Sequence, residues 1–177
     1  RVAILRRSPN ASVSMDVYAD RLIDGLRTVR PDWMIADYYP HVPTDQNPVI
    51  KGWSGIRKYY ERYWSYPRRI SQIDADIFHI IDHSDGYLSG WTRSSHHPSV
   101  VTCHDLINLI KPETFKGRAQ FPLLSMTAWR WGVEGMQKAD HVVTVSTQTK
   151  QDVVTHLPIP ENHITVVPNA VDPVFTP

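Results

Sequence analysis

The stretch DIFHII, residues Asp76–Ile81, is apolar almost throughout, and three similar runs follow it: VVTC at Val100–Cys103, VVTV at Val142–Val145 and ITVV at Ile164–Val167. Short continuous apolar runs rich in β-branched residues are typical of strands that are covered on both faces, as in a parallel sheet. These four runs therefore predict the central strands of an α/β domain.

Helical patterns separate the later runs. Apolar or small residues recur at intervals of four, three and four between Leu124 and Gly135, and Thr147–Leu157 follows Ser146, which is a good helix cap. Strand alternating with helix predicts right-handed βαβ units and an open, doubly wound sheet.

The same alternation holds at the N-terminus. Val2–Leu5 predicts a strand, and Met15–Val29 predicts a helix that Ser12 or Ser14 caps and Pro31 ends. Trp33–Tyr39 predicts the next strand. We therefore expect a Rossmann-like α/β domain with a mainly parallel sheet over residues 1–167.

Composition excludes several classes of protein. The 177 residues carry 19 Lys and Arg against 18 Asp and Glu, so no polycation indicates a nucleic-acid partner. The single cysteine, Cys103, excludes an internal disulfide framework, and no apolar run approaches the roughly 18 residues of a membrane span. We expect a cytoplasmic protein. Since the chain begins at Arg1 without Met, we also expect it to be a piece of a longer protein.

Polar side chains follow the ends of the predicted strands. In a parallel sheet, the loops at the carboxyl ends of the strands carry the binding and catalytic residues. One loop follows the first strand, a second begins at Asp82, and a third begins at His104. A His beside an Asp in such a place binds a hydroxyl or titrates near neutrality. The alternative is that Asp82 and Asp105 only cap turns and that His83 and His104 are bystanders. The candidate residues in these loops are Arg7, Ser8, Asn10, Asp82, His83, Tyr87, His104 and Asp105.

Metal patterns are weak. His79 and His83 lie four residues apart, but on a strand that spacing separates them by about 13 Å, so we interpret His79 as a hydrogen-bonded core histidine. Asp74-Ala75-Asp76 matches a metal-dependent Asp-x-Asp signature at the amino end of a strand, which is the wrong end for a site. We predict no metal site and no cofactor; the spaced glycines of a dinucleotide fingerprint are absent after the first strand.

One segment is both basic and aromatic. Lys51–Arg69 contains six cations and one acid, and six of the 18 aromatic residues lie within Trp53–Tyr66. Helical spacing places aromatic residues on one face and cations on the other. Three interpretations stay open: packing on the sheet, docking on an anionic membrane surface, and stacking on nucleic acid. The residues we predict for a membrane surface are Trp53, Arg57, Lys58, Arg62 and Trp64.

Three motifs in order resemble the N-terminal domain of GT-B glycosyltransferases of family 4: Val100–Leu106, Ala139–Ser146 and Ile164–Asp172. Asp76–His79 is similar to the central strand of that family. The resemblance covers the whole chain in order and is tightest from residue 74 onward.

The resemblance implies an enzyme that moves a sugar from a UDP-, GDP- or ADP-sugar to a glycan or lipid-linked acceptor, with retention and without a metal. The family's histidine at the point of sugar transfer corresponds to His104. The family's glycine-rich first loop corresponds to Ser8–Ser14, which contains no glycine in this sequence. Residues 168–177 would begin the linker to a C-terminal donor-binding domain. Ser146 and Asn169 complete the expected substrate-binding set, beside His104 and Asp105 as catalytic residues.

Two alternatives of other classes stay open. One is a non-enzymatic α/β domain whose crevice binds a sugar or a phosphate. The other is a metal hydrolase that uses His83 and His104.

Overall fold

The computed structural model describes residues 1–41, 51–94, 96–115 and 122–170. Within these ranges, six strands form one parallel sheet in the order β2-β1-β3-β4-β5-β6. This confirms the predicted Rossmann-like fold, and each predicted apolar run contains a strand. The strands are β1 (Val2–Leu5), β2 (Ile35–Tyr38), β3 (Ile77–Ile80), β4 (Ser99–Cys103), β5 (His141–Thr144) and β6 (Ile164–Val166).

The strand order reverses between β1 and β3. The chain leaves β1 for β2 on one side, then crosses to β3 on the other side of β1 and continues outward to β6. Loops from the carboxyl ends of β1 and β3 diverge at such a switch point and leave a crevice between them. This crevice is where the candidate loops at Arg6 and Asp82 begin.

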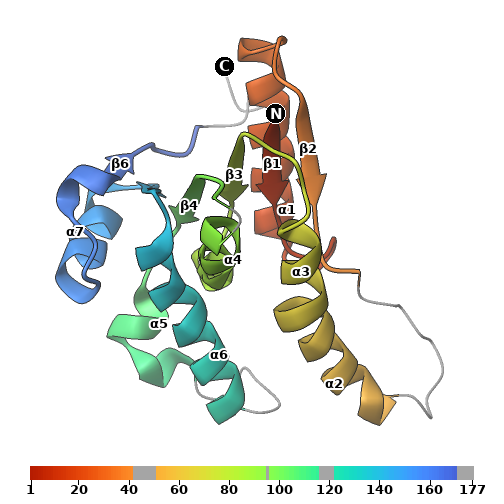
Figure 1. Ribbon diagram of the computed structural model, residues 1–177. Coiled ribbons are helices and arrows are strands. Elements are labelled where there is room, and N and C mark those ends of the chain that lie inside the picture. The colour runs from red at the N-terminus through yellow and green to blue at the C-terminus, as the bar shows by residue number, and fades with distance from the viewer. Residues whose placement is uncertain (42–50, 95, 116–121, 171–177) are drawn as a thin grey trace, which may run out of the picture.

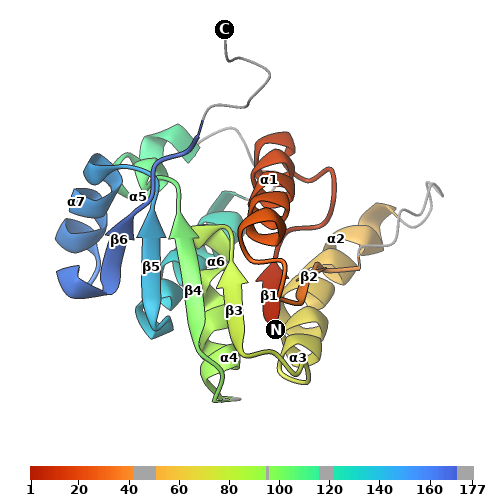
Figure 2. The same ribbon diagram turned by 90° about the horizontal axis from the view of Figure 1, so that it is seen from above.

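The helices cover the two faces of the sheet unequally. Figure 2 shows α1 on one face and α3, α4 and α6 on the other. The first face buries a small cluster around Ile4, Ala19 and Ile23, whereas the second buries the main core, which includes Phe78 and Met136. The helices are α1 (Val13–Val29), α2 (Lys51–Tyr60), α3 (Tyr66–Ile70), α4 (Ser89–Ser94), α5 (Ile107–Ile110), α6 (Pro122–Gly135) and α7 (Thr147–His156).

The helix boundaries largely follow the predicted signals. Helix α1 ends at Val29, before Pro31; Ser12 occupies its N-cap position, but the Ser12 side chain does not make the predicted cap hydrogen bond. The Ser146 hydroxyl accepts a hydrogen bond from the Thr149 N–H at 3.0 Å, which caps α7 as predicted. Within the described ranges, no helix has both the length and the apolar character needed to cross a bilayer.

A π-helical turn, Glu61–Ser65, joins α2 to α3 (Figure 1). The N–H of Tyr66 donates to the carbonyl of Glu61, five residues back. Pro67 explains the wider turn, because proline has no N–H for the Tyr63 carbonyl and its ring clashes with that carbonyl in a regular α-helix. The extra residue rotates the side chains that precede it relative to those that follow.

Three glycines let α6 contact the backbone of the 3₁₀ segment His83–Leu88. A Cβ on Gly86 would lie 2.6 Å from the Gly132 carbonyl oxygen, and one on Gly135 would lie 2.5 Å from Tyr87 Cα. A Cβ on Gly132 would collide with the Ser84 carbonyl. These atoms belong to the main chain and cannot rotate away, so the crossing requires glycine.

We therefore expect Gly132→Ala to destabilise the fold. Overpacking against backbone typically lowers the free energy of unfolding by roughly 1–3 kcal/mol, and this clash lies at the severe end of that range. Chemical denaturation followed by circular dichroism measures the change.

Gly25→Ala is the matched control. Gly25 lies in α1, and a Cβ there would meet nothing within 4 Å. The substitution should raise the free energy of unfolding by about 0.5–1 kcal/mol, because alanine favours the helix. Equal stability of the two variants would contradict the backbone contact.

Candidate functional site

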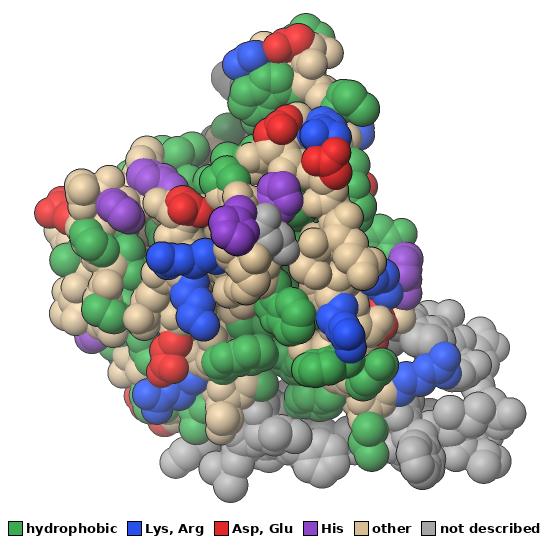
Figure 3. Space-filling view, in the orientation of Figure 1, with side chains coloured by type: hydrophobic (Ala, Val, Ile, Leu, Met, Phe, Trp, Pro, Cys, Tyr) green, Lys and Arg blue, Asp and Glu red, His purple; other side chains and the backbone are tan. Residues whose placement is uncertain are grey.

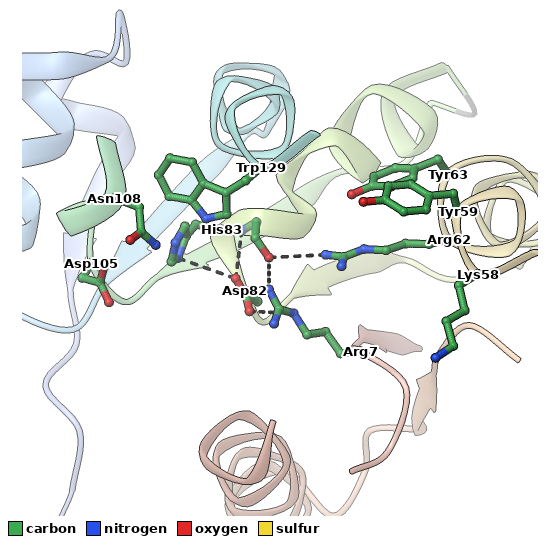
Figure 4. A pocket seen from close by; sticks show the side chains of 11 residues that line it. Arg7, Lys58, Tyr59, Arg62, Tyr63, Asp82, His83, Asp105, Asn108 and Trp129 are labelled. Atoms are coloured by element: carbon green, nitrogen blue, oxygen red, sulfur yellow. Dashed lines mark hydrogen bonds and ion pairs between the residues drawn. The ribbon is translucent and has the colours of Figure 1, made fainter. Parts of the chain in front are cut away.

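A cavity of about 520 Å³ opens at the carboxyl ends of β1, β3 and β4 (Figure 4). Its walls come from the loops after these strands, from α2 and the π-helical turn, and from α6. Both charged and aromatic side chains line it: Arg7, Lys58, Tyr59, Arg62, Tyr63, Asp82, His83, Ser84, Asp105, Asn108 and Trp129.

Two arginines and two buried carboxylates form a charged floor, in which Asp82 lines this cavity and Asp85 lines the cavity next to it. Arg7 Nε lies 3.0 Å from Asp82 Oδ2 and 3.7 Å from Asp85 Oδ2, and Arg62 Nε donates to Asp85 Oδ1 at 3.1 Å. Both guanidinium groups also reach the Ser84 hydroxyl, Arg62 at 3.5 Å. The two arginines and the two carboxylates therefore form one ion-pair cluster that joins three segments distant in sequence.

The charges in this cluster stabilise one another. Burial acts to raise the pKa of Asp82, but Arg7 and the N–H of Ser84 act against it, and that pKa is lowered. Burial also opposes the charge on Arg62, yet Asp85 raises its pKa above the ordinary value. Both shifts favour the charged forms of Asp82 and Arg62.

His83 borders the cavity with an unused nitrogen. Its ring meets Trp129 edge-on at 5.9 Å, and its Nδ1 has no hydrogen-bond partner among the described residues, with Asp82 Oδ1 at 3.7 Å. Burial lowers the pKa of His83 despite the opposing effect of Asp82. A neutral imidazole with an unsatisfied buried nitrogen suits hydrogen bonding to a ligand hydroxyl.

His104 lies beside this cavity but does not line it. Its Nε2–H donates to the Ile81 carbonyl at 2.9 Å, and its ring meets Tyr18 edge-on at 4.8 Å. Because a carbonyl only accepts, Nε2 carries the proton and Nδ1 is the unprotonated nitrogen of the neutral ring. Thr149 donates to the His104 carbonyl at 3.1 Å, which connects the ends of β4 and β5.

Asp82 and Asp105 both cap the turns that follow them. Asp82 accepts from the N–H of Ser84 at 2.8 Å, and Asp105 accepts from the N–H of Ile107 at 3.1 Å. The capping interpretation is therefore confirmed. Both residues nevertheless line the cavity, so capping fixes their orientation there.

His79 is a hydrogen-bonded histidine within the sheet, as predicted. Its Nε2 lies 2.8 Å from Thr102 Oγ1, which in turn lies 3.3 Å from the Tyr18 hydroxyl. Burial and the nearby His104 lower the pKa of His79 to about 4. Across the ranges that the structure describes, no three His, Cys, Asp or Glu residues gather as metal ligands would.

A second cavity of about 450 Å³ adjoins the first and shares Arg7, Lys58 and Arg62 with it. Ser8 and Asn10 line this second cavity, as does Asp85. Asn10 has a φ of 65°, a left-handed conformation that glycine usually supplies, and its N–H donates to Asp16 Oδ2 at 2.8 Å. The first loop thus turns tightly without the glycine that the family resemblance led us to expect.

The other predicted residues line neither cavity. Tyr87 is 3% exposed, and its hydroxyl donates to the Arg62 carbonyl at 2.6 Å while its ring stacks on Trp131. Its position therefore supports Arg62 and gives no support to direct substrate binding. Ser146 caps α7, and Asn169 lies exposed beyond β6.

The structure corrects the predicted division of the aromatic-basic segment. Arg62 turns inward to Asp85, and Lys58 lines both cavities, so neither side chain belongs to an outer basic face as predicted. Two aromatic residues of the predicted apolar face, Tyr59 and Tyr63, stack at 5.7 Å and line the larger cavity.

Part of this segment faces outward. Ile56, Tyr60 and Trp64 are 48–66% exposed and Arg57 is exposed, whereas Tyr66 is buried. Figure 3 shows hydrophobic and basic side chains side by side on the face that carries α2 and α3. The Trp53 side chain lies outside the described residues. The division follows helical spacing, because Tyr59 and Tyr63 lie four residues apart on one side and Tyr60 and Trp64 lie four apart on the next.

Several cavity residues were missed from the sequence. Asp85 and Ser84 lie inside the predicted Asp82 loop, so their position was a usable signal. Asn108 and Trp129 carried no such signal in the sequence. Trp129, for example, belongs to a helix whose residue spacing indicates only amphipathic packing.

Comparisons with known proteins identify the family and support the fold. The family Glycosyltransferase Family 4 matches residues 9–175. No curated protein matches the chain. Among solved structures, "lipopolysaccharide outer core galactosyltransferase WaaB apo form" is similar at 12% identity and a TM-score of 0.57, over 96% of this chain and 46% of that one.

Two further structures are similar at lower scores. "LpCGTa in complex with UDP" has 7% identity and a TM-score of 0.47, over 98% of this chain and 48% of that one. A UDP-glucosyltransferase from Polygonum tinctorium, described as capable of glucosylating indoxyl, has 12% identity and a TM-score of 0.42, over 94% and 51%. This chain thus spans about half the length of these structures.

The likeness to the galactosyltransferase structure, with a TM-score of 0.57, shows the fold alone. No conclusion rests on the two structures with lower TM-scores. The family match extends over nearly the whole chain, and the parallel sheet is the Rossmann-like type that the sequence motifs predict. The chain therefore belongs to glycosyltransferase family 4, as a domain of the N-terminal type.

Proposed function

We propose that this domain binds the saccharide acceptor of a retaining, metal-independent glycosyltransferase. The donor is a UDP-, GDP- or ADP-sugar held by a second domain, and the acceptor is a glycan or a lipid-linked glycan. The observation that carries the proposal is the cavity of about 520 Å³ at the switch point of the sheet, lined by aromatic rings and hydrogen-bonding groups.

The lining suits a sugar. A sugar ring presents hydroxyl groups at its edge and C–H groups on its faces, so it needs polar partners and flat apolar ones. Tyr59, Tyr63 and Trp129 supply the flat surfaces, while Asp105 and Asn108 supply polar groups. The unused Nδ1 of His83 adds a hydrogen-bonding site between Trp129 and Asp82.

His104 and Asp105 are the residues that we place at the transfer point. The Ile81 carbonyl fixes the proton of His104 on Nε2, which makes Nδ1 an acceptor for a sugar hydroxyl. On the sheet side, the Tyr18 ring packs edge-on against the His104 ring. The Tyr18 hydroxyl in turn lies within hydrogen-bond distance of Thr102 Oγ1. Asp105 fixes the following loop by capping α5.

We also propose a peripheral position at an anionic membrane on the cytoplasmic side. The exposed Ile56, Tyr60 and Trp64 form an outward aromatic surface next to Arg57 and Arg68, and the Arg68 guanidinium lies 5.2 Å from the Trp64 ring. Aromatic rings suit the headgroup region and cations suit acidic lipids.

The first expected outcome concerns activity. The 177-residue chain alone should bind saccharides without transferring sugar, and transfer should require a donor-binding domain added in trans. Binding is followed by the indole N–H signal of Trp129, and transfer is assayed with a panel of nucleotide sugars in the presence of chelator.

Trp33→Phe is a control for Trp129→Phe, because Trp33 packs beneath Arg30, outside both cavities. Since Trp129→Phe removes the indole signal, titration calorimetry measures saccharide binding by both variants, and only Trp129→Phe should weaken it. Tight binding without turnover once the second domain is present would favour the non-enzymatic alternative. Sugar transfer by the chain alone would contradict the requirement for a second domain. A chain that binds no saccharide would contradict the proposed acceptor-binding function.

The second expected outcome concerns His104. In the enzyme that contains this domain, His104→Ala should lower kcat by about 10²-fold, as for loss of a positioned polar group at a reacting centre. The free energy of unfolding should fall by only about 1 kcal/mol, since one hydrogen bond is lost. His163→Ala, in an exposed turn, should change neither value. Wild-type kcat for His104→Ala would remove His104 from the transfer point.

The third expected outcome concerns the membrane. Replacing Arg57 and Arg68 with Gln should weaken binding to vesicles rich in acidic lipid by roughly 30-fold, at about 1 kcal/mol per cation. Arg30→Gln, which removes a cation at the end of α1, on the opposite face of the sheet from α3, should have no effect. Equal binding of the double variant and the wild type to acidic vesicles would refute the membrane surface.

A further inference from the structure

The smaller cavity is more cationic than the larger one, although they share three cations. Arg7, Lys58 and Arg62 line both. In the larger cavity two carboxylates, Asp82 and Asp105, accompany them, whereas in the smaller cavity only Asp85 does. The excess of positive charge therefore lies in the smaller cavity, away from Trp129.

Lys58 is the unneutralised cation of this group. Arg7 and Arg62 share the carboxylates of Asp82 and Asp85, so their charges are compensated. In the part of the chain that the structure describes, the exposed Lys58 has no ion pair or hydrogen bond, and no dashed line joins its amine to the other side chains drawn in Figure 4. An ammonium group held at a cavity wall without a counterion favours an anionic ligand.

The two cavities also differ in the rest of their lining. The larger has the aromatic rings and the hydrogen-bonding groups of Asn108 and His83. The smaller has the compact side chains of Pro9, Ala11 and Pro40 beside the polar Ser8 and Asn10. A ligand that spans both would place its sugar ring in the first and a compact charged group in the second.

We propose that the acceptor is a phosphorylated saccharide, with its sugar in the larger cavity and its phosphate in the smaller one against Lys58. This inference rests on the proposed function and adds the chemical class and the orientation of the acceptor. The already formed Arg7–Asp82 and Arg62–Asp85 pairs position the guanidinium N–H groups at the junction of the cavities, and Lys58 supplies the net charge that binds the phosphate.

The test is a binding titration of the full chain with three probes: a methyl glycoside, the same sugar carrying a phosphate, and inorganic phosphate. The phosphorylated sugar should bind at least tenfold more tightly than either other probe. Its affinity should fall as salt rises from 0.05 to 0.5 M, since a partly exposed charge pair is screened. A uronic acid of the same sugar should bind more weakly than the phosphorylated sugar if phosphate is the group recognised.

Lys58→Gln should weaken binding of the phosphorylated sugar about tenfold, the loss expected for one charge-assisted contact, and should weaken binding of the uncharged methyl glycoside by a clearly smaller factor. Arg57→Gln is the matched control, because Arg57 is an adjacent exposed cation on α2 that lines neither cavity. Thermal midpoints of both variants should match the wild type.

Nuclear magnetic resonance gives the orientation. The sugar should shift the Trp129 indole N–H, and the phosphate should shift the backbone N–H of Asn10 and Ala11. The reverse pattern would overturn the proposal, as would equal affinity for the sugar with and without phosphate, or an unchanged affinity in Lys58→Gln. Inorganic phosphate binding as tightly as the phosphorylated sugar would also overturn it, since the site would then hold any anion.

These outcomes separate the two proposals. If the methyl glycoside shifts Trp129 and the phosphate adds nothing, the acceptor proposal fails while the saccharide function stands. If no saccharide shifts Trp129, the saccharide function itself fails.

Discussion

The contact between the main chain of α6 and the 3₁₀ segment His83–Leu88 holds the functional edge of this domain together. Gly132 and Gly135 bring α6 against Ser84 and Tyr87, closer than any side chain would allow. The same 3₁₀ segment carries Asp85 and follows Asp82, and α6 carries Trp129. One backbone crossing thus fixes both the charged floor and the aromatic wall of the larger cavity.

The charged floor depends on the pairing of its charges. Removing a carboxylate from water costs several kcal/mol unless it is paired and hydrogen-bonded. Asp82 and Asp85 are buried against Arg7 and Arg62, whose side chains are 28% and 32% exposed. Arg7 arrives from the loop after β1 and Arg62 from the π-helical turn, so the cluster joins β1, β3 and the α2–α3 segment. A ligand therefore meets a preformed surface whose remaining net charge lies on Lys58.

The α2–α3 segment has two sides with different neighbours. Tyr59 and Tyr63 turn to the larger cavity, where Tyr63 packs on Tyr87 and Trp131, while Tyr60 and Trp64 remain outside. Because the members of each pair lie four residues apart, helical spacing places them on the same side. A single segment thereby contributes both to the larger cavity and to the outer surface.

Much of the fold could be predicted from the sequence, because its signals are local. Continuous apolar runs indicate strands covered on both faces, and Ser146 and Pro31 mark helix ends, so the strands and the α1 and α7 boundaries follow from neighbouring residues alone. The loops at strand ends were equally predictable, which is why Arg7, Asp82, His83 and Asp105 were found.

Other features depend on residues far apart in the chain, and no local pattern encodes them. Regular helical spacing placed Arg62 on an outer face, but Arg62 turns inward to a partner 23 residues away, Asp85. Trp129 and Asn108 enter the cavity because glycines allow a close helix crossing and because β4 lies beside β3. The sequence by itself determined the order of strands and helices and the loops that carry chemistry. Only the tertiary structure decided which side chains share a cavity, because that depends on packing between segments that the sequence pattern does not relate.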